Sequence, residues 1–313
     1  MPSDVIGWLL EGDVSVQYQT KRDLLGAAAP ELAPLRRRIA TEGWGLEFLK
    51  RRDNATGMWG GGLYSPKWTS THYTLLDLHF IGLDPATREY RESAALLLDG
   101  LWYDGGQRRK GVYQDVCVTG MLLIIACPAP VSTGKIHEII DYLLERQYPD
   151  GGWNCRWQRG DTHSSLHTTL NVLEGLHEYS QNGYTYRIAD IRAAVPRAHA
   201  FILQHRLYQS HRTGETIEPR MLALPHPRWR FDILRCLDYF QSAGVPYDPG
   251  MEDALTVLER KRNTNGSWPL QARIPGEVHF DMEQAGKPGR WNTLRALRVF
   301  KKYAPERCTP DTE

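Results

Sequence analysis

The sequence predicts an all-α protein in which about five helical hairpins close into an α/α toroid behind an N-terminal helical cap. Three observations lead to this prediction. Apolar residues recur with a helical period, a Gly- and Trp-rich turn recurs between the helices, and no comparable stretch alternates with the two-residue period of a strand. At 313 residues the chain is long enough for one large core.

The repeats follow one another along the chain, each with an outer helix, a turn and an inner helix of the texture T-x-x-L-x-x-L. The clearest copy spans residues 136–176, where Ile139, Leu143 and Leu144, and then Leu170, Leu173 and Leu176, mark amphipathic helices. Its turn reads YPDGGWNCRWQRGDTHSSL. Related copies occupy residues 46–83, 92–126, 201–240 and 255–300. Gly pairs permit the tight turns, and Trp59 and Trp153 are expected to wedge between outer and inner helices.

Residues 1–40 fall outside this period and are predicted to form a helical hairpin that caps one edge of the array, with residues 41–313 as the toroid itself. Within the cap, the basic run at residues 36–38 is interpreted as a solvated helix face. The whole chain is expected to form a single domain.

Bulk composition excludes several classes of function. The formal net charge is +1, from 38 Lys and Arg against 37 Asp and Glu. The chain as a whole therefore has no large positive charge that would attract nucleic acid. A secretory signal and an 18-residue apolar run are both lacking, which predicts a cytoplasmic protein without a transmembrane segment. The five cysteines are expected to be free thiols, with Cys127 and Cys236 structural.

The segment at residues 147–153, QYPDGGW, resembles the QW motif of squalene and oxidosqualene cyclases. The repeat layout over about residues 40–303 is similar to the terpenoid cyclase and protein prenyltransferase superfamily. This resemblance implies the toroid, whose functional residues lie in the central cavity, but it does not imply a particular reaction.

Aligning the inner helices on their leucines places five residues at one inward position: His72, Cys117, His167, Phe231 and Trp291. In the β subunits of protein farnesyl- and geranylgeranyltransferases, a D-x-C in one repeat and a His in the next hold a catalytic zinc. Asp115 and Cys117 match the D-x-C, and His167 matches the histidine. The resemblance therefore implies zinc held by Asp115, Cys117 and His167, the three-ligand set of a catalytic site with one open position.

The same resemblance implies a site for an anionic leaving group. His72 occupies the place of a histidine that binds diphosphate in that family, and Arg108, Arg109 and Lys110 lie upstream of the D-x-C, as basic residues do there. Three cations just before a helix N-terminus favour an anion. We therefore expect phosphate or diphosphate to bind there.

Chemistry leaves alternatives to this zinc set open. Asp115 converges with Cys117 only if it lies just outside the helix start. Cys155, in the turn before the His167 helix, can replace Asp115, and His163 is a further candidate ligand. Alternatively, Cys117 is a small buried hydrophobe and His167 a hydrogen-bonded cavity histidine.

The chain also departs from the family. Protein prenyltransferases are longer and work with an α subunit, and the D-x-D-D, D-C-T-A and D-D-x-x-D motifs do not occur here. The resemblance therefore implies zinc-assisted chemistry on an isoprenoid or other apolar small molecule. Aromatic residues near the inner-helix starts either line such a pocket or fill the throat of the toroid by packing: Trp68, Tyr73, Trp102, Tyr113, Trp229 and Trp291. The sequence indicates no protein partner. The alternatives are a non-catalytic binding scaffold and a carbohydrate-active toroid using Asp115 and Asp232.

Overall fold

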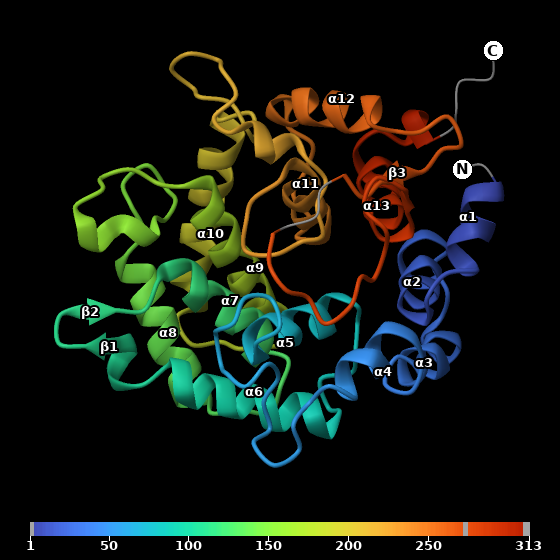
Figure 1. Ribbon diagram of the computed structural model, residues 1–313. Coiled ribbons are helices and arrows are strands. Elements are labelled where there is room, and N and C mark those ends of the chain that lie inside the picture. Colours follow the sequence, from blue (N-terminus) through green and yellow to red (C-terminus); the bar gives the residue numbers. More distant parts are fainter. Residues whose placement is uncertain (1–2, 272–274, 309–313) are drawn as a thin grey trace.

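The computed structural model describes residues 3–271 and 275–308, and α-helices dominate it (Figure 1). The α-helices are α1 (Ser3–Leu10), α2 (Val14–Gln19), α3 (Ala29–Arg38), α4 (Gly43–Leu49), α5 (Thr71–Phe80), α6 (Arg88–Leu101), α7 (Val116–Ala126), α8 (Thr133–Glu145), α9 (Leu166–Gln181), α10 (Ile188–Gln204), α11 (Ile233–Ser242), α12 (Glu252–Arg260) and α13 (Arg290–Tyr303). A short π-helix, η1 (Thr20–Leu24), continues α2, and short 3₁₀ turns cover Asp104–Gly106, Cys155–Arg159, Pro219–Leu222, Pro249–Met251 and Pro305–Cys308. The predicted all-α class is confirmed.

Strands are limited to two small antiparallel hairpins among the described residues. β1 (Gln107–Arg109) pairs with β2 (Val112–Tyr113), and β3 (Trp268–Pro269) pairs with β4 (Pro288–Gly289). Each hairpin lies in the connection that leads into an inner helix, α7 or α13. They shape the turns and do not form a sheet that could carry the core.

Two kinds of helix alternate along the chain, as the repeats predict. In α8, buried Ile136, Ile139, Ile140 and Leu143 follow the i, i+3, i+4, i+7 pattern of an amphipathic outer helix. In α7, every residue except Cys117 is buried. A helix that is apolar all round belongs in the interior, so α7 and its equivalents α5, α9, α11 and α13 form the inner set.

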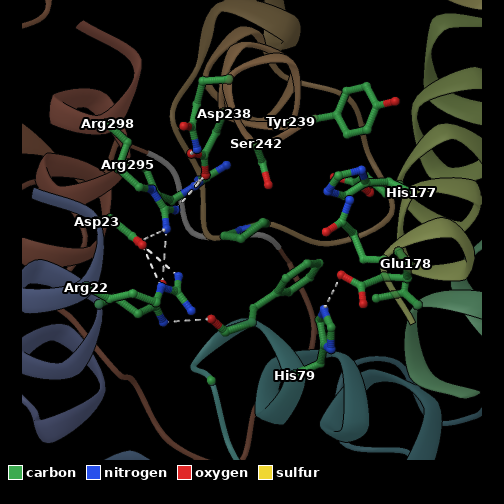
Figure 2. Close-up of a pocket in the computed structure, with 18 of the residues that line it drawn as sticks. Arg22, Asp23, His79, His177, Glu178, Asp238, Tyr239, Ser242, Arg295 and Arg298 are labelled. Carbon is green, nitrogen blue, oxygen red and sulfur yellow. Dashed lines mark hydrogen bonds and ion pairs between the residues drawn. The ribbon is translucent and has the colours of Figure 1, made fainter. Parts of the chain in front are cut away.

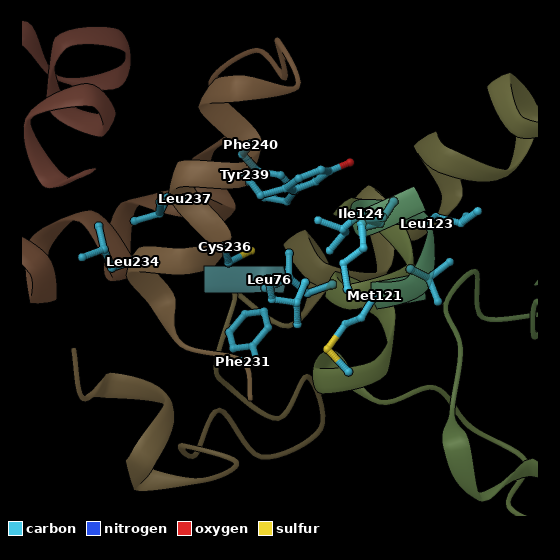
Figure 3. Close-up of a cluster of buried hydrophobic side chains, with 14 of the residues drawn as sticks. Leu76, Met121, Leu123, Ile124, Phe231, Leu234, Cys236, Leu237, Tyr239 and Phe240 are labelled. Atoms are coloured by element: carbon cyan, nitrogen blue, oxygen red, sulfur yellow. The ribbon is translucent and has the colours of Figure 1, made fainter. Parts of the chain in front are cut away.

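The inner helices pack on one another through apolar side chains. Figure 3 shows Leu76 of α5, Met121 of α7 and Cys236 of α11 in one buried cluster. Helices α7 and α9 approach most closely where Gly120 meets Gly175, because a Cβ on Gly120 would lie 2.6 Å from a backbone oxygen of α9. This contact requires glycine.

Three tryptophans occupy equivalent places between an outer and the following inner helix. All three indoles are fully buried, and each ring N–H donates to a carbonyl near the end of the outer helix: Trp59 to Phe48, Trp153 to Leu143 and Trp268 to Leu258, all at 2.7 Å. Their backbone N–H groups donate to threonine hydroxyls of the inner helices: Thr71, Thr169 and Thr293. The wedge role expected for Trp59 and Trp153 is confirmed, and Trp268 shares it.

The QW-like segment is a structural joint. The Gln147 amide donates to the carbonyls of Gly151, at 2.7 Å, and of Ala194 in α10, at 2.9 Å. Gly151 has φ 97°, and a Cβ there would lie 2.5 Å from the Arg197 carbonyl oxygen. A side chain at this position would therefore separate the turn from α10.

The N-terminal helices lie beside the last inner helix, where blue and red ribbons meet in Figure 1. The Arg290 Nε donates to the Trp8 carbonyl at 2.8 Å, and Arg298 pairs with Asp23 at 2.9 Å. Helix α2 also contacts α4. The first and last segments of the chain are thus held together by direct contacts.

All five cysteines are free thiols, and Cys127 and Cys236 are buried as expected. Across residues 3–271 and 275–308, the helices are too short or too polar for any of them to traverse a lipid bilayer.

Candidate functional site

The residues aligned at the inner-helix starts do occupy equivalent backbone positions in most repeats. His72, Cys117, His167 and Trp291 are each the second residue of their helix, while Phe231 lies two residues before α11. His72 and His167 nevertheless contact different residues, Tyr64 and Tyr73 in one case and Glu218 and Phe231 in the other.

His72 is fully buried, and neither ring nitrogen has a hydrogen-bond partner among the described residues. Burial lowers its pKa to about 3, so the ring is neutral at physiological pH. Its ring packs against Tyr64 and Tyr73, with centroids 5.2 Å and 5.0 Å away.

Cys117 and Cys155 lie together although 37 residues separate them in the chain. The backbone N–H of Cys117 donates to Cys155 Sγ at 3.1 Å, and the Thr168 hydroxyl donates to the same sulfur at 3.4 Å. The interaction between the two cysteine side chains lowers the pKa of the Cys155 thiol, and the same interaction, followed by burial, raises the pKa of Cys117. Asp115 is the N-cap residue of α7, just outside the helix as its convergence with Cys117 requires.

His167 points to a different group of residues. Its Nε2 lies 3.1 Å from a Glu218 carboxylate oxygen, and its Nδ1 accepts the Phe231 N–H at 2.8 Å. Both ring nitrogens therefore already have partners away from Cys117. His163 is exposed, and within the described ranges no three His, Cys, Asp or Glu side chains are arranged to hold a metal ion.

The basic run lies at the tip of the β1–β2 hairpin, where Arg108, Arg109 and Lys110 are all exposed. His72 is buried in α5. Within the described residues no hydrogen bond or ion pair joins these cations to His72, and the anion site expected from them stays a prediction.

A cavity of about 610 Å³ lies where α4, α5 and α13 meet residues 278–285. We call it the aromatic cavity; its walls are Phe48, Trp68, Asp77, His226, Arg228, Leu270, Val278, His279, Phe280, Asp281, Met282, Glu283, Gln284, Ala285 and Trp291. Its volume falls within the range of about 300–1,000 Å³ common for small-molecule sites. Large apolar rings beside the buried Asp77 and the half-buried Glu283 make it the strongest candidate site in the molecule.

One of these carboxyl groups, Asp77, is buried in the middle of α5. It bonds the His226 Nε2 at 3.0 Å and the Arg228 guanidinium at 2.5 Å. Burial alone would raise the pKa of Asp77, but Arg228 and then His226 outweigh it, so the net pKa lies below its ordinary value. Asp77 is therefore ionised at neutral pH.

Glu283 shows the opposite behaviour in the same cavity. Its Oε1 accepts the backbone N–H of Arg290 at 2.6 Å and that of Trp291 at 3.2 Å, at the start of α13. These bonds favour the ionised form, yet burial outweighs them and raises the pKa of Glu283 to about 7. A substantial fraction of Glu283 is protonated near neutral pH.

No protein-family model and no curated protein matches this chain.

The second cavity measures about 960 Å³ and lies toward the C-terminal ends of α5, α9 and α11 (Figure 2). We call it the polar cavity because charged side chains of η1, α9, α11 and α13 line it, among them Arg22, Asp23, Glu178, Asp238 and Arg298. Trp291 lines both cavities, so the two adjoin along α13.

Asp77, His226, Arg228 and Glu283 did not emerge from the sequence as candidates. Asp77 did carry a signal, since it is an acidic residue inside the apolar helix THYTLLDLHF, and buried charges require partners. Glu283 lies in an irregular segment without periodicity, and no signal in the sequence marked it as a candidate.

Proposed function

We propose that this chain is an α/α-toroid enzyme, similar to terpene cyclases and prenyltransferases, that carries out acid–base chemistry on an apolar, isoprenoid-like molecule in the aromatic cavity. The observation that carries the proposal is the divergence of two carboxyl groups lining one cavity. The pKa of Asp77 is lowered, while that of Glu283 is raised to about 7. Titratable groups whose pKa values are separated in this way identify an acid and a base.

The contacts between elements support a ring. Helix α5 contacts α7, α7 contacts α9 and α11 contacts α13. The ion pair of Glu174 with Arg235 links α9 to α11. From α13 the contacts return through α2 and α4 to α5. In this proposal the N-terminal helices close the joint between the last and first hairpins.

The lining of the cavity supports an apolar substrate. Phe48, Trp68, Phe280 and Trp291 present aromatic rings, accompanied by aliphatic side chains such as Val278. Aromatic faces stabilise a cation by roughly 0.5–2 kcal/mol each. Such walls suit a hydrocarbon that develops positive charge during reaction.

In the proposed division of roles, protonated Glu283 donates a proton to the bound molecule. Asp77, fixed by Arg228 and His226, remains a carboxylate that stabilises positive charge and accepts a proton. Asp77 is buried and Glu283 half-buried, and partial exclusion of water strengthens the effect of a charge on a bound molecule.

Zinc remains an expectation from the resemblance. As arranged, Cys117 and Cys155 do not combine with His167, whose nitrogens bond to Glu218 and Phe231. We therefore assign no step to a metal.

The carbohydrate-active alternative required Asp115 and Asp232 to share a cavity. Asp232 instead caps α11, where its Oδ1 accepts the Arg235 N–H at 2.8 Å, and neither carboxylate lines the aromatic or the polar cavity. The Asp77 and Glu283 pair could serve a sugar as well, so the experiment below includes an oligosaccharide. The scaffold alternative predicts binding without turnover.

Isothermal titration calorimetry tests the proposal with three probes: farnesol, a long-chain tertiary amine that is cationic at neutral pH, and a linear glucose oligosaccharide. We expect the isoprenoid alcohol and the amine to bind and the oligosaccharide not to bind. Phe280→Ala should weaken both by about tenfold, which is about 1.4 kcal/mol of lost ring contact. Glu145→Gln, on an exposed position of α8, is the control and should change neither affinity.

Binding of the oligosaccharide alone would overturn the apolar assignment. Unaltered affinity for farnesol and the amine in Phe280→Ala would remove the aromatic cavity from the proposal. The acid–base part is tested separately, since Glu283→Gln should retain farnesol binding yet abolish conversion of any isoprenoid substrate found in an activity screen.

A further inference from the structure

We infer that the polar cavity is a second binding site, which takes a small polyvalent anion bearing phosphate or carboxylate groups against α13. This inference goes beyond the proposed function and does not depend on it. It rests on a surplus of positive charge at the joint between η1, α11 and α13, which comes from the largely buried Arg295 and Arg298 and the exposed Arg22 (Figure 2).

Three guanidinium groups at this joint share two carboxylates. Arg22 and Arg298 both pair with Asp23, at 2.5 Å and 2.9 Å. Arg298 and Arg295 both pair with Asp238, at 2.8 Å and 3.1 Å. The described carboxylates that contact these arginines therefore leave one positive charge without a counter-charge.

Two of the arginines also have buried nitrogens without a partner. Arg295 Nη1 and Arg298 Nε have no hydrogen-bond acceptor among the described residues. The Arg295 side chain is only 4% exposed and that of Arg298 12%. Leaving buried donors of a charged group unsatisfied destabilises the folded state. Both nitrogens are themselves closed to solvent, so an anion in the cavity would bind the accessible parts of these two guanidinium groups.

Further cations line the same cavity and bond only to backbone carbonyls within residues 3–271 and 275–308. The Arg36 Nε donates to the Gly82 carbonyl, and the Lys302 Nζ donates to that of Gln241 at 2.9 Å. Lys301 likewise donates to two carbonyls of η1. Although the sequence predicted a solvated face for residues 36–38, Arg36 is half-buried and lines the cavity.

Negative charge gathers on the opposite wall. Glu174 pairs with Arg235, and Glu178 with His79 at 3.4 Å. The C-terminal ends of α5 and α9 add partial negative charge there. The anion is therefore expected against α13 and η1, where the cations outnumber the carboxylates.

The volume of the cavity, about 960 Å³, exceeds that of a single phosphate, and the cations are spread over α3 and α13. This favours a molecule with two or more anionic groups. Arginine binds phosphate and carboxylate in the same planar, forked geometry. The expected ligand is therefore a polyvalent oxyanion. The experiment below distinguishes a phosphate compound from a carboxylate compound.

Calorimetry and thermal unfolding of the full chain test this inference with tripolyphosphate and with citrate, with KCl holding ionic strength constant. We expect at least one of these anions to bind and to raise the melting temperature, because it would hold η1 against α13. Arg36→Ala and Lys302→Ala should each weaken binding several-fold. Asp84→Asn removes a negative charge from the wall and should tighten it.

Lys135→Ala is the matched control, since this lysine pairs with Asp99 on the outer helices and should leave the affinity unchanged. The inference fails if neither anion binds or raises the melting temperature more than KCl does at the same ionic strength. It also fails if the Arg36→Ala and Lys302→Ala variants bind the anion as tightly as the unaltered chain. Binding that instead disappears in the double variant Arg108→Ala, Arg109→Ala would place the anion at the exposed hairpin.

Discussion

Replacing Glu283 with glutamine should change how stability depends on pH. Burial raises the pKa of Glu283 from 4.5 to about 7, while the unfolded chain retains the lower value. Between these values the native state holds a proton that the unfolded state has released, so stability falls as pH rises. Each tenfold change in the protonation equilibrium is worth about 1.4 kcal/mol, and the whole shift therefore corresponds to about 3 kcal/mol.

Glutamine mimics the protonated acid and retains an oxygen for the N–H groups of Arg290 and Trp291. Urea unfolding, followed by tryptophan fluorescence from pH 4 to pH 8, measures the difference. The gain of Glu283→Gln over the unaltered chain should grow by about 3 kcal/mol across this interval, on the order of 6 °C in melting temperature. Glu145→Gln, at an exposed site, should show almost no such trend. A constant difference for Glu283→Gln would mean that the native carboxyl has the same pKa as in the unfolded chain. Glu283 would then be ionised at neutral pH, which refutes its role as an acid.

The packing predictions concern glycine and tryptophan. Gly120→Ala should destabilise the protein by about 1–3 kcal/mol, because its Cβ would lie 2.6 Å from the backbone of α9, whereas Gly7→Ala, with open space around the Cβ, should stabilise α1 by up to about 1 kcal/mol. Thermal unfolding of both variants checks the sign of each change. Trp153→Phe should cost about 1–3 kcal/mol, because the carbonyl of α8 that accepts the indole N–H would lose its partner; an unchanged melting temperature would contradict this. Elemental analysis tests the zinc expectation: the resemblance predicts about one zinc per chain, lost in Cys117→Ala and His167→Ala. Full zinc in both variants would exclude that ligand set.

The sequence predicted the helical class well, because helical periodicity is a local signal. The buried stripe of α8 and the tryptophan joints at Trp59 and Trp153 follow from the pattern alone. The sequence did not predict which side chains the irregular connections bring next to each inner helix. The aligned His72 and His167 occupy equivalent helix positions, yet they contact different neighbours.

The candidate site was predicted much less well, because its residues come from distant segments. Asp77 meets His226 and Arg228 across about half of the chain, and no periodicity links them. The raised pKa of Glu283 is a product of burial, which no short motif encodes. In contrast, the sequence did suggest that Cys155 lies near Cys117, because it offered Cys155 as an alternative zinc ligand. Cys117 is at the start of one inner helix, and Cys155 lies in the turn before the next.

A crystal structure with the long-chain tertiary amine bound tests the central claim most directly. We expect its hydrocarbon chain to lie between Trp68 and Trp291, with its ammonium group next to the Asp77 carboxylate. Density for the amine only in the polar cavity or on the outer surface, with the aromatic cavity unchanged, would contradict the proposed site.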